Sequence, residues 1–443
     1  MSSMQLLPYK QQVSSLLRLG LPIVVGQLGM IILGLADTIM IGHHSTEELA
    51  AAAFVNNVFN LAIIFATGFS YGLTPLIGML QGGGNTQGIG RVFRNALAAN
   101  ASVAVLLTAV MYTVYCFVDK LGQPEELLPH IRPYFVLQLI SLLFIMLFNG
   151  FRQFAEGLTD TRTPMWILLG GNALNIFGNY LLIYGSFGFP EWGLFGAGVS
   201  TLVSRIVMLL VFIGVVAVAR RYKVYREAIL RSRFNRNDFM QLNALGWPIA
   251  LQMGMETIMV GWLGSIPLAA HQIMISVSTI GFMVYYGMGA ALAVRVSHFM
   301  GQKDFPNLRR AVNSGMGIIL SLAIVASLFF YLARTPIIYS FTEDHEVMIV
   351  VSSLIFSLIV YQFGDALQIT FANALRGTTD VKPMMWIAFF SYFIVALPVG
   401  YLCGFTWGGG VVGVWVAFPA GLFTAGFLFW LRFRYRLQQL MKK

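Results

Sequence analysis

Long apolar runs alternate with short polar turns along the whole chain, and this pattern predicts helices that cross a membrane. A helix needs about 20 predominantly apolar residues to cross about 30 Å of hydrocarbon. The runs that are long enough cover residues 16–42, 50–80, 96–118, 133–151, 165–187, 194–219, 244–264, 268–297, 312–333, 346–371, 384–404 and 409–432. We therefore expect an all-α membrane protein with twelve transmembrane helices.

The two halves of the chain repeat each other. The segment RLGLPIVVGQLGMIILGLADTIMIG at Arg18–Gly42 shares its start and its end with ALGWPIALQMGMETIMVG at Ala244–Gly261. Further on, EGLTDTRTPMW at Glu156–Trp166 matches RGTTDVKPMMW at Arg376–Trp386. Because each half holds six predicted helices, an even number, both halves should have the same orientation in the membrane. We predict pseudo-symmetric six-helix halves at residues 1–218 and 244–443, joined by a basic linker at residues 219–243.

Composition excludes an ordinary soluble protein. Of the 443 residues, 57% are hydrophobic and only 10% are charged, and the mean hydropathy is +0.74. The two cysteines, Cys116 and Cys403, lie far apart in apolar runs, so they predict neither a disulfide framework nor a metal site. We expect the lipid bilayer to be the chain's surroundings and no cofactor to be bound.

Basic residues are concentrated on one side of the predicted membrane. Segments on the side of the N-terminus hold 24 of the 28 Lys and Arg residues, whereas the opposite loops hold three bases and nine acids. This positive-inside pattern predicts that both termini are cytoplasmic. The net charge of +10 is explained by basic loops beside anionic lipid, so we expect no nucleic-acid partner.

Three acidic residues remain inside the apolar runs, namely Asp37, Glu256 and Asp365. Placing a carboxylate in hydrocarbon costs roughly 3 kcal/mol, so such residues are usually retained for ion or proton transport. A carboxylate near a helix end that reaches headgroup water is the structural alternative for the first two. One base, Arg205, is also inside a run, and we expect it to snorkel or to form a structural hydrogen bond.

Polar neighbours strengthen a cation-binding interpretation. Tyr361 precedes Asp365 by four residues, which places both on one helical face. Asn175 and Asn179 are also four residues apart, and Thr201 lies on the next predicted helix. Amide, hydroxyl and carboxylate oxygens are ligands for small cations. The alternative for each asparagine is a hydrogen bond that only holds helices together.

Taken together, the twelve runs, the same-orientation halves, the paired Pro22 and Pro248 and the repeated segments resemble the multidrug and toxic compound extrusion family. The resemblance covers nearly the whole chain and is nearest to the bacterial cation-coupled drug exporters. It implies that a helix-seven glutamate and a helix-ten aspartate bind the coupling ion, and Glu256 and Asp365 match these positions, with Tyr361 beside the aspartate.

The N-terminal half matches the family less completely. Some members use an aspartate on helix one together with an asparagine and an aspartate four residues apart on helix five. Here Asp37 and Asn175 match, but Asn179 stands where those members have the second aspartate. We keep these three residues and Thr201 as candidates for binding a cation or the transported substrate.

The function implied is secondary antiport. We expect a monomeric multi-pass protein of the bacterial cytoplasmic membrane that is not an enzyme and exports amphipathic, often cationic compounds in exchange for Na⁺ or H⁺. A lipid-linked oligosaccharide flippase is an alternative, but it would need a basic cavity, and Arg205 is the one base in the middle of a predicted helix. An intramembrane aspartyl protease is a second alternative, although the GxGD pattern is absent.

Helix seven is shorter than its counterpart in the repeat. The segment Gly20–Gly42 spans 22 steps, whereas Gly246–Gly261 spans 15, a difference of seven residues or roughly 10 Å of helix. We expect either that Glu256 shifts along the helix axis or that Thr257–Gly264 is not helical. Both alternatives would separate Glu256 from Asp365 and predict weak coupling.

Overall fold

The computed structural model describes residues 6–263, 268–336 and 345–442, and these residues form helices and turns without strands. Within this part of the chain the contacts divide the protein into two compact units. Unit 1 consists of Met1–Val24 and Leu251–Lys443, and unit 2 consists of Val25–Ala250.

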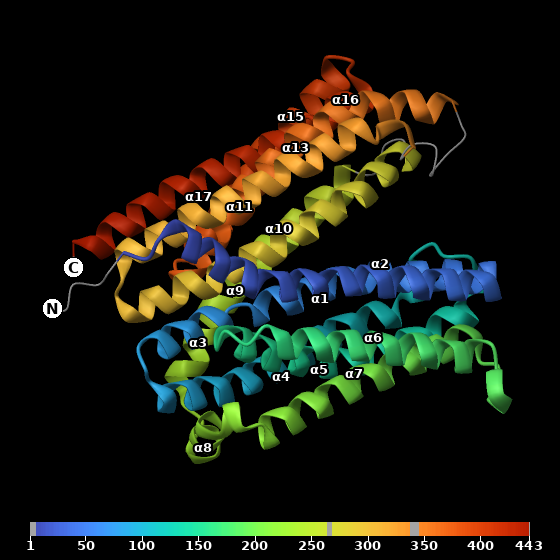
Figure 1. Cartoon of the computed structure of the whole chain (residues 1–443). Coiled ribbons are helices and arrows are strands. Elements are labelled where there is room, and N and C mark those ends of the chain that lie inside the picture. Colours follow the sequence, from blue (N-terminus) through green and yellow to red (C-terminus); the bar gives the residue numbers. More distant parts are fainter. Residues whose placement is uncertain (1–5, 264–267, 337–344, 443) are drawn as a thin grey trace. The chain divides into compact units, whose positions relative to one another are not determined.

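Figure 1 labels the helices of the N-terminal part of the chain. Short 3₁₀ turns connect several of them, including Arg220–Tyr222 before α8. The helices are α1 (Tyr9–His44), α2 (Thr46–Ser70), α3 (Leu73–Gly82), α4 (Thr86–Cys116), α5 (Leu128–Gly157), α6 (Arg162–Ile183), α7 (Gly193–Val218) and α8 (Lys223–Arg231).

The C-terminal part contains long helices and two π-helical segments, Phe390–Ala396 and Leu402–Thr406. The α-helices are α9 (Arg236–Leu263), α10 (Leu268–Gln302), α11 (Phe305–Leu332), α13 (His345–Gly377), α14 (Lys382–Phe389), α15 (Leu397–Tyr401), α16 (Gly410–Trp415) and α17 (Ala417–Met441).

The all-helical membrane fold is confirmed. Eleven helices of the described part are long and apolar enough to cross a membrane. The remaining predicted run, residues 244–264, falls on α9. The run at residues 50–80 is α2 followed by α3, and the run at 384–404 is α14 and α15 with the π-helical segments.

In unit 2, α5 is the helix that holds the others together. It packs against α2, α3, α4 and α7, while α6 packs on α7. Phe59 of α2 and Phe135 of α5 are almost fully buried, and their ring centres lie 4.7 Å apart in an edge-to-face arrangement. Burying such aromatic pairs stabilises the bundle in the absence of a strong hydrophobic driving force between helices.

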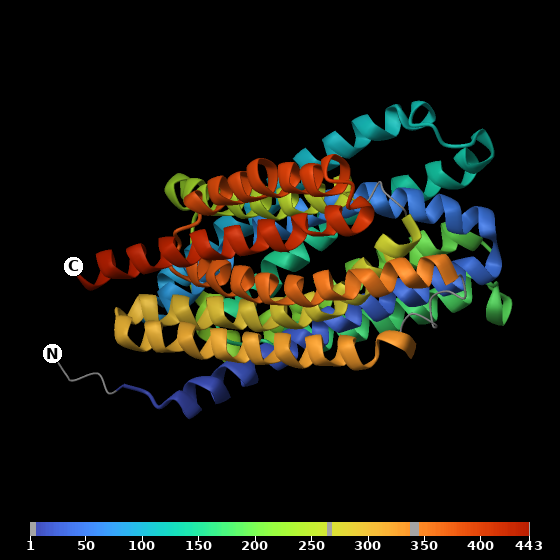
Figure 2. The same ribbon diagram turned by 90° about the horizontal axis from the view of Figure 1, so that it is seen from above.

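In unit 1, α13 has the role that α5 has in unit 2. It packs against α10, α11 and α17, which run beside it in both views (Figures 1 and 2). By sequence repeat, α10, α11 and α17 correspond to α2, α4 and α7. The same set of helix pairs is therefore in contact in each unit.

The repeat extends to single glycines. A Cβ atom on Gly157 would lie 2.7 Å from Cβ of Ile77, and one on Gly377 would lie 2.6 Å from Cβ of Val296. Both distances are too short for any side chain. These four residues are equivalent in the sequence repeat, so each unit brings the same two helices together at a position that admits only glycine.

The shortened seventh helix is not unwound. α9 is one continuous helix from Arg236 to Leu263, so the expectation that Thr257–Gly264 leaves helical form is wrong up to Leu263. Gly264 lies outside the described residues. A helix of 20 residues, about 30 Å long, still spans the hydrocarbon, which explains why the deletion can be absorbed without breaking backbone hydrogen bonds.

The basic linker folds onto unit 2. α8 packs against α4, and Arg91 on α4 pairs with Asp238 at 2.6 Å. The backbone N–H of Asn235 donates to the Asn95 side chain at 2.9 Å. The division into units follows contacts, whereas residues 1–218, 219–243 and 244–443 were delimited by the repeat, and that partition stays a prediction.

Candidate functional site

The C-terminal candidate site is built around the carboxylate of Asp365. This residue lies in the middle of α13, and its side chain is completely buried. Neither of its carboxylate oxygens has a hydrogen-bond partner among the residues that the structure describes. Glu256 on α9 lies close enough for the two carboxyl groups to interact electrostatically. Despite the shortening by seven residues, Glu256 therefore lies within electrostatic range of Asp365.

Three tyrosine side chains surround these acids. Tyr361, one turn before Asp365, interacts electrostatically with both carboxyl groups. Tyr285 of α10 interacts with Asp365, and Tyr392 interacts with both acids. Tyr392 comes from the π-helical segment Phe390–Ala396, and such segments often place side chains at functional sites. The structure thus brings the three predicted residues together and adds two phenols.

A hydrogen-bond chain connects Glu256 to a buried arginine. Gln252 precedes Glu256 by one helical turn on α9, and its Nε2 donates to Glu256 Oε2 at 3.3 Å. Its Oε1 accepts a hydrogen bond from the Arg376 guanidinium at 2.8 Å. Gln252 and Arg376 are both almost fully buried. The guanidinium fixes the orientation of the Gln252 amide and so aims its N–H group at the glutamate.

Arg376 and Gln252 were not predicted as site residues. Arg376 had been counted among the basic residues at the cytoplasmic helix ends. One signal was present in the repeat, where Arg376 takes the position of Glu156. Glu156 is buried and paired with Arg152 at 2.7 Å, so the same position holds opposite charges in the two units.

The N-terminal candidate site joins α1, α6 and α7. Asn179 donates to Asp37 Oδ1 at 2.6 Å. The Asn175 amide is oriented so that its nitrogen donates to Asp37 Oδ1 at 2.9 Å. Its oxygen accepts a hydrogen bond from the Thr201 hydroxyl at 3.1 Å. Both asparagines are buried, whereas Asp37 is partly exposed. All four predicted residues are therefore adjacent within unit 2.

Arg205 takes the structural role expected of it. Its guanidinium donates to Gln138 Oε1 of α5 at 3.1 Å and also to the hydroxyl of Ser141. In the described part of the chain it forms no ion pair with an acid at hydrogen-bond distance. Arg205 therefore holds α7 against α5.

The two sites differ in the side-chain groups that they offer to a ligand. The C-terminal site has two carboxylates and three phenol groups, and the N-terminal site has one carboxylate with two amides and a hydroxyl. Carboxylate, amide and hydroxyl oxygens can replace part of the hydration shell of a small cation. A buried carboxylate can equally accept a proton. Both arrangements suit ion or proton binding inside a membrane protein.

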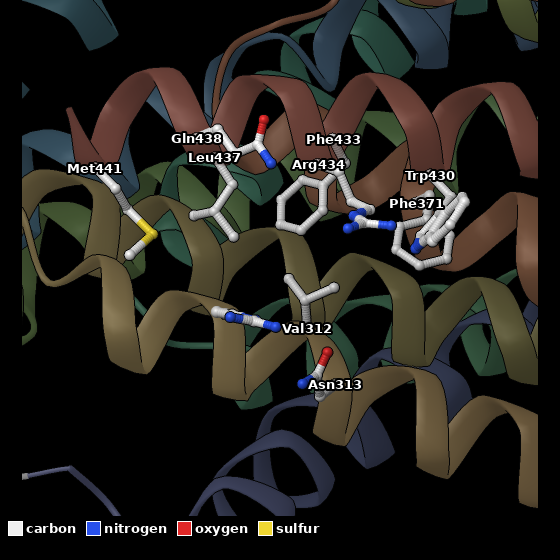
Figure 3. A pocket seen from close by; sticks show the side chains of 10 residues that line it. Val312, Asn313, Phe371, Trp430, Phe433, Arg434, Leu437, Gln438 and Met441 are labelled. Carbon is white, nitrogen blue, oxygen red and sulfur yellow. The ribbon is translucent and has the colours of Figure 1, made fainter.

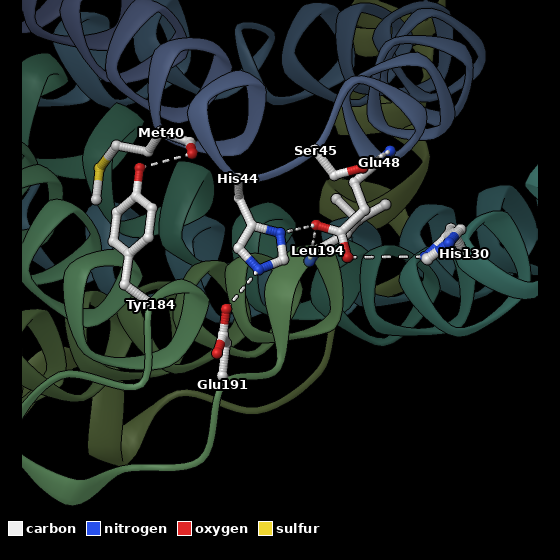
Figure 4. Close-up of polar contacts among 8 residues, drawn as sticks. All are labelled: Met40, His44, Ser45, Glu48, His130, Tyr184, Glu191 and Leu194. Atoms are coloured by element: carbon white, nitrogen blue, oxygen red, sulfur yellow. Dashed lines mark hydrogen bonds and ion pairs between the residues drawn. The ribbon is translucent and has the colours of Figure 1, made fainter.

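A further polar cluster in unit 2 is formed by side chains of two predicted outer loops (Figure 4). Glu48 is buried, interacts with His44 at 2.8 Å and accepts a hydrogen bond from the backbone N–H of Leu194 at 2.9 Å. His44 also contacts Glu191 at 3.1 Å. Gly193 has φ of +53°, and a Cβ atom there would collide with Glu48 Oε1. The cluster connects α1, α2 and the start of α7.

Comparison with known proteins identifies the family. The sequence model of the MatE family matches residues 22–181 and 251–402, well over half of the chain. The chain belongs to the MatE family. Both matched regions contain residues of the carboxylate sites, and the family consists of membrane transporters, so this MatE protein is a transporter and not an enzyme.

Similar proteins agree with this assignment over the full length. Multidrug resistance protein NorM of Photobacterium profundum is 29% identical over 448 residues, covering 96% of each chain. An outward-facing multidrug resistance MATE transporter of the MOP superfamily has a TM-score of 0.89 at 20% identity, covering 98% of this chain and 97% of that one. The eukaryotic MATE transporter AtDTX14 has a TM-score of 0.85 at 16% identity, covering 98% and 99%. These two structures share the fold.

Proposed function

We propose that this MatE protein is a secondary antiporter that exports amphipathic, often cationic compounds in exchange for Na⁺ or H⁺. The observation that carries the proposal is the completely buried carboxylate of Asp365, which lacks a hydrogen-bond partner in the described residues and interacts electrostatically with Glu256. A buried negative charge with no compensating donor is costly unless a cation or proton neutralises it. The full-length similarity to a protein named for multidrug resistance supports the cargo class.

Binding at this site would couple the two fluxes. A proton or Na⁺ that binds at Glu256 and Asp365 removes one of their two negative charges, and the site with the lower charge favours one conformation of the bundle. An exported cation favours the other conformation because it needs the negative charge free. Each ligand shifts the population toward the state it binds better, which exchanges one for the other across the membrane.

We place the protein in the bacterial cytoplasmic membrane with both termini and the linker helix α8 in the cytoplasm. The supporting observation is the distribution of charge, with 24 of 28 basic residues on that side. We expect a monomer without a cofactor, with no resident metal other than the transported Na⁺.

The position of Arg205 argues against the flippase alternative. A carrier of lipid-linked sugar phosphates needs a cationic group that is free to bind phosphate in the middle of the membrane-spanning bundle. The Arg205 guanidinium instead donates to Gln138 and Ser141 on the neighbouring helix. The protease alternative is removed by the family itself, which consists of transporters.

Efflux measured in proteoliposomes under an imposed Na⁺ gradient, and separately under a proton gradient, tests the proposal. Asp365→Asn should abolish gradient-driven efflux while the protein still folds, because the amide keeps the size of the side chain and removes its charge. Asp119→Asn is a matched control, since Asp119 is an exposed aspartate paired with Arg132. If Asp365→Asn protein transported normally under both gradients, Asp365 would not be the coupling site.

A further inference from the structure

A cavity of about 380 Å³ lies between α11 and α17 and shares no lining residue with the carboxylate site (Figure 3). Both helices belong to unit 1, and Phe371 of α13 closes part of the cavity. The cavity lies near the first residues of α11 and the last residues of α17. It is therefore at the membrane level where the proposed topology places lipid headgroups of the cytoplasmic leaflet.

Two exposed arginines line the cavity, Arg309 from α11 and Arg434 from α17. No acidic residue is among the lining residues. Within residues 6–263, 268–336 and 345–442, neither guanidinium is engaged in an ion pair or a hydrogen bond. The Arg434 guanidinium lies 4.9 Å from the centre of the Trp430 ring, which holds it at the cavity wall.

Two neighbouring arginines, one on each of these helices, have internal partners. Arg310 donates to the backbone carbonyl of Leu7 at 2.7 Å. Arg432 forms two hydrogen bonds with Asp380, at 2.6 and 3.0 Å. These bonds hold both side chains against partners inside unit 1. Arg309 and Arg434 therefore stand out as cations whose donors remain available to a ligand in the cavity.

The rest of the wall is apolar with two amide groups. Val312 of α11 and Phe433 and Leu437 of α17 are buried and face the cavity between the two helices (Figure 3). The amides of Asn313 and Gln438 flank this apolar surface. A ligand that fills the site must combine an anionic group with a hydrocarbon part.

We propose that this cavity binds an anionic glycerophospholipid. Its phosphate lies between Arg309 and Arg434, because guanidinium groups form paired charge-assisted hydrogen bonds with phosphate oxygens. Asn313 and Gln438 donate to the headgroup or ester oxygens. One acyl chain lies along the apolar surface formed by Phe433 and Leu437, and basic pockets between transmembrane helices near the cytoplasm are suited to such headgroups.

The charges exclude the proposed cargo from this cavity. A cationic amphiphile would meet two guanidinium groups and no acid, so it would be repelled. A soluble phosphate would leave the apolar wall unused. The lipid binding does not depend on the antiport proposed above, because it requires only that the chain lies in a membrane.

Native mass spectrometry of the full-length protein tests the inference. Detergent-purified protein is titrated with dioleoyl phosphatidylglycerol or with dioleoyl phosphatidylcholine, which has the same acyl chains and no net charge. We expect one phosphatidylglycerol to be retained with higher affinity than phosphatidylcholine. The double variant Arg309→Gln/Arg434→Gln should lose this preference, with a roughly tenfold or larger loss of affinity.

A matched variant controls for the loss of charge. Arg231→Gln/Arg233→Gln removes two exposed arginines of the linker region, which do not line the cavity, and should bind phosphatidylglycerol as the unmodified protein does. Asn313→Trp keeps both arginines and fills the cavity, so it should also reduce binding. The inference is wrong if the cavity variants and the linker variant lose the same amount of binding, or if soluble glycerol phosphate displaces the lipid at equal concentration.

Discussion

At the scale of single residues, the side chain of Gln252 sets the surroundings of Glu256. It accepts from Arg376 and donates to Glu256, and it is 1% exposed. Replacing it with alanine removes a donor to the glutamate and deprives a buried guanidinium of one acceptor, which costs roughly 1–3 kcal/mol. We expect Gln252→Ala to weaken the apparent affinity for the coupling ion roughly tenfold.

The affinity is measured from the Na⁺ concentration or the pH at which efflux is half-maximal. Asn243→Ala is the control, because Asn243 lies on the same helix but accepts a hydrogen bond from Trp247 at 3.1 Å instead of contacting the glutamate. Equal affinities in the two variants would show that Gln252 does not orient the coupling site.

The second prediction at this scale concerns Asp37. It is the single carboxylate of the N-terminal site, bonded to Asn179 and partly exposed, so it can meet a positively charged compound. We expect Asp37→Asn to reduce export of cationic compounds several-fold more than export of neutral ones. The test is to measure the transport rates of a cationic dye and of a neutral dye in the same proteoliposomes. An equal loss for both dyes would point to a coupling or structural role.

The sequence predicts the carboxylates of these sites better than the residues that surround them. Asp365 and Glu256 are conspicuous because a carboxylate in an apolar run has a large solvation cost. Gln252, Tyr285 and Tyr392 carry no such cost, and their roles depend on which helices meet. The π-helical segment that places Tyr392 has no recognisable signal in the apolar pattern.

At the scale of helices, the Glu48 cluster ties the turn between α1 and α2 to the start of α7. Glu48→Ala removes the acceptor for the buried backbone N–H of Leu194 and the partner of His44, at a cost of roughly 1–3 kcal/mol. We expect a thermal midpoint several degrees lower in detergent. Glu47→Ala is the matched control, because Glu47 is exposed and precedes Glu48 directly. Identical thermal midpoints for Glu48→Ala and Glu47→Ala would show that the cluster does not stabilise the fold.

Helix positions follow from the sequence because each run must satisfy its own backbone hydrogen bonds in lipid. The sequence predicts less well where a helix is interrupted within a run and how long each helix is. The apolar pattern does not reveal the division between α2 and α3, and the sequence leaves open whether the shortened helix seven unwinds or Glu256 shifts along its axis. α9 remains helical to Leu263, since an unpaired backbone group in lipid costs more than a displaced side chain. Whether coupling is weaker for this reason stays a prediction.

At the scale of the whole molecule, two helices belong to both units. α1 contributes its residues up to Val24 to unit 1 and the rest to unit 2, and α9 contributes its residues up to Ala250 to unit 2 and the rest to unit 1. Pro22 and Pro248, which are equivalent in the repeat, each precede the boundary by two residues. The chain therefore passes from one unit to the other at two equivalent positions of the repeat, each just after a proline.

We expect these prolines to make α1 and α9 easier to bend near the residues where each helix passes from one unit to the other. A proline inside a helix removes the hydrogen bond to the carbonyl four residues earlier and so permits bending. If the proposed alternating access bends both helices, Pro22→Ala and Pro248→Ala restore one hydrogen bond each and stiffen them. We expect higher thermal stability together with efflux slowed several-fold, because a helix interior favours alanine over proline by roughly 3 kcal/mol.

Pro133→Ala in α5 is the control, since that helix lies entirely in unit 2 and its proline is close to the helix start. Unchanged efflux rates in both variants, with raised stability, would mean that neither proline takes part in the transport cycle.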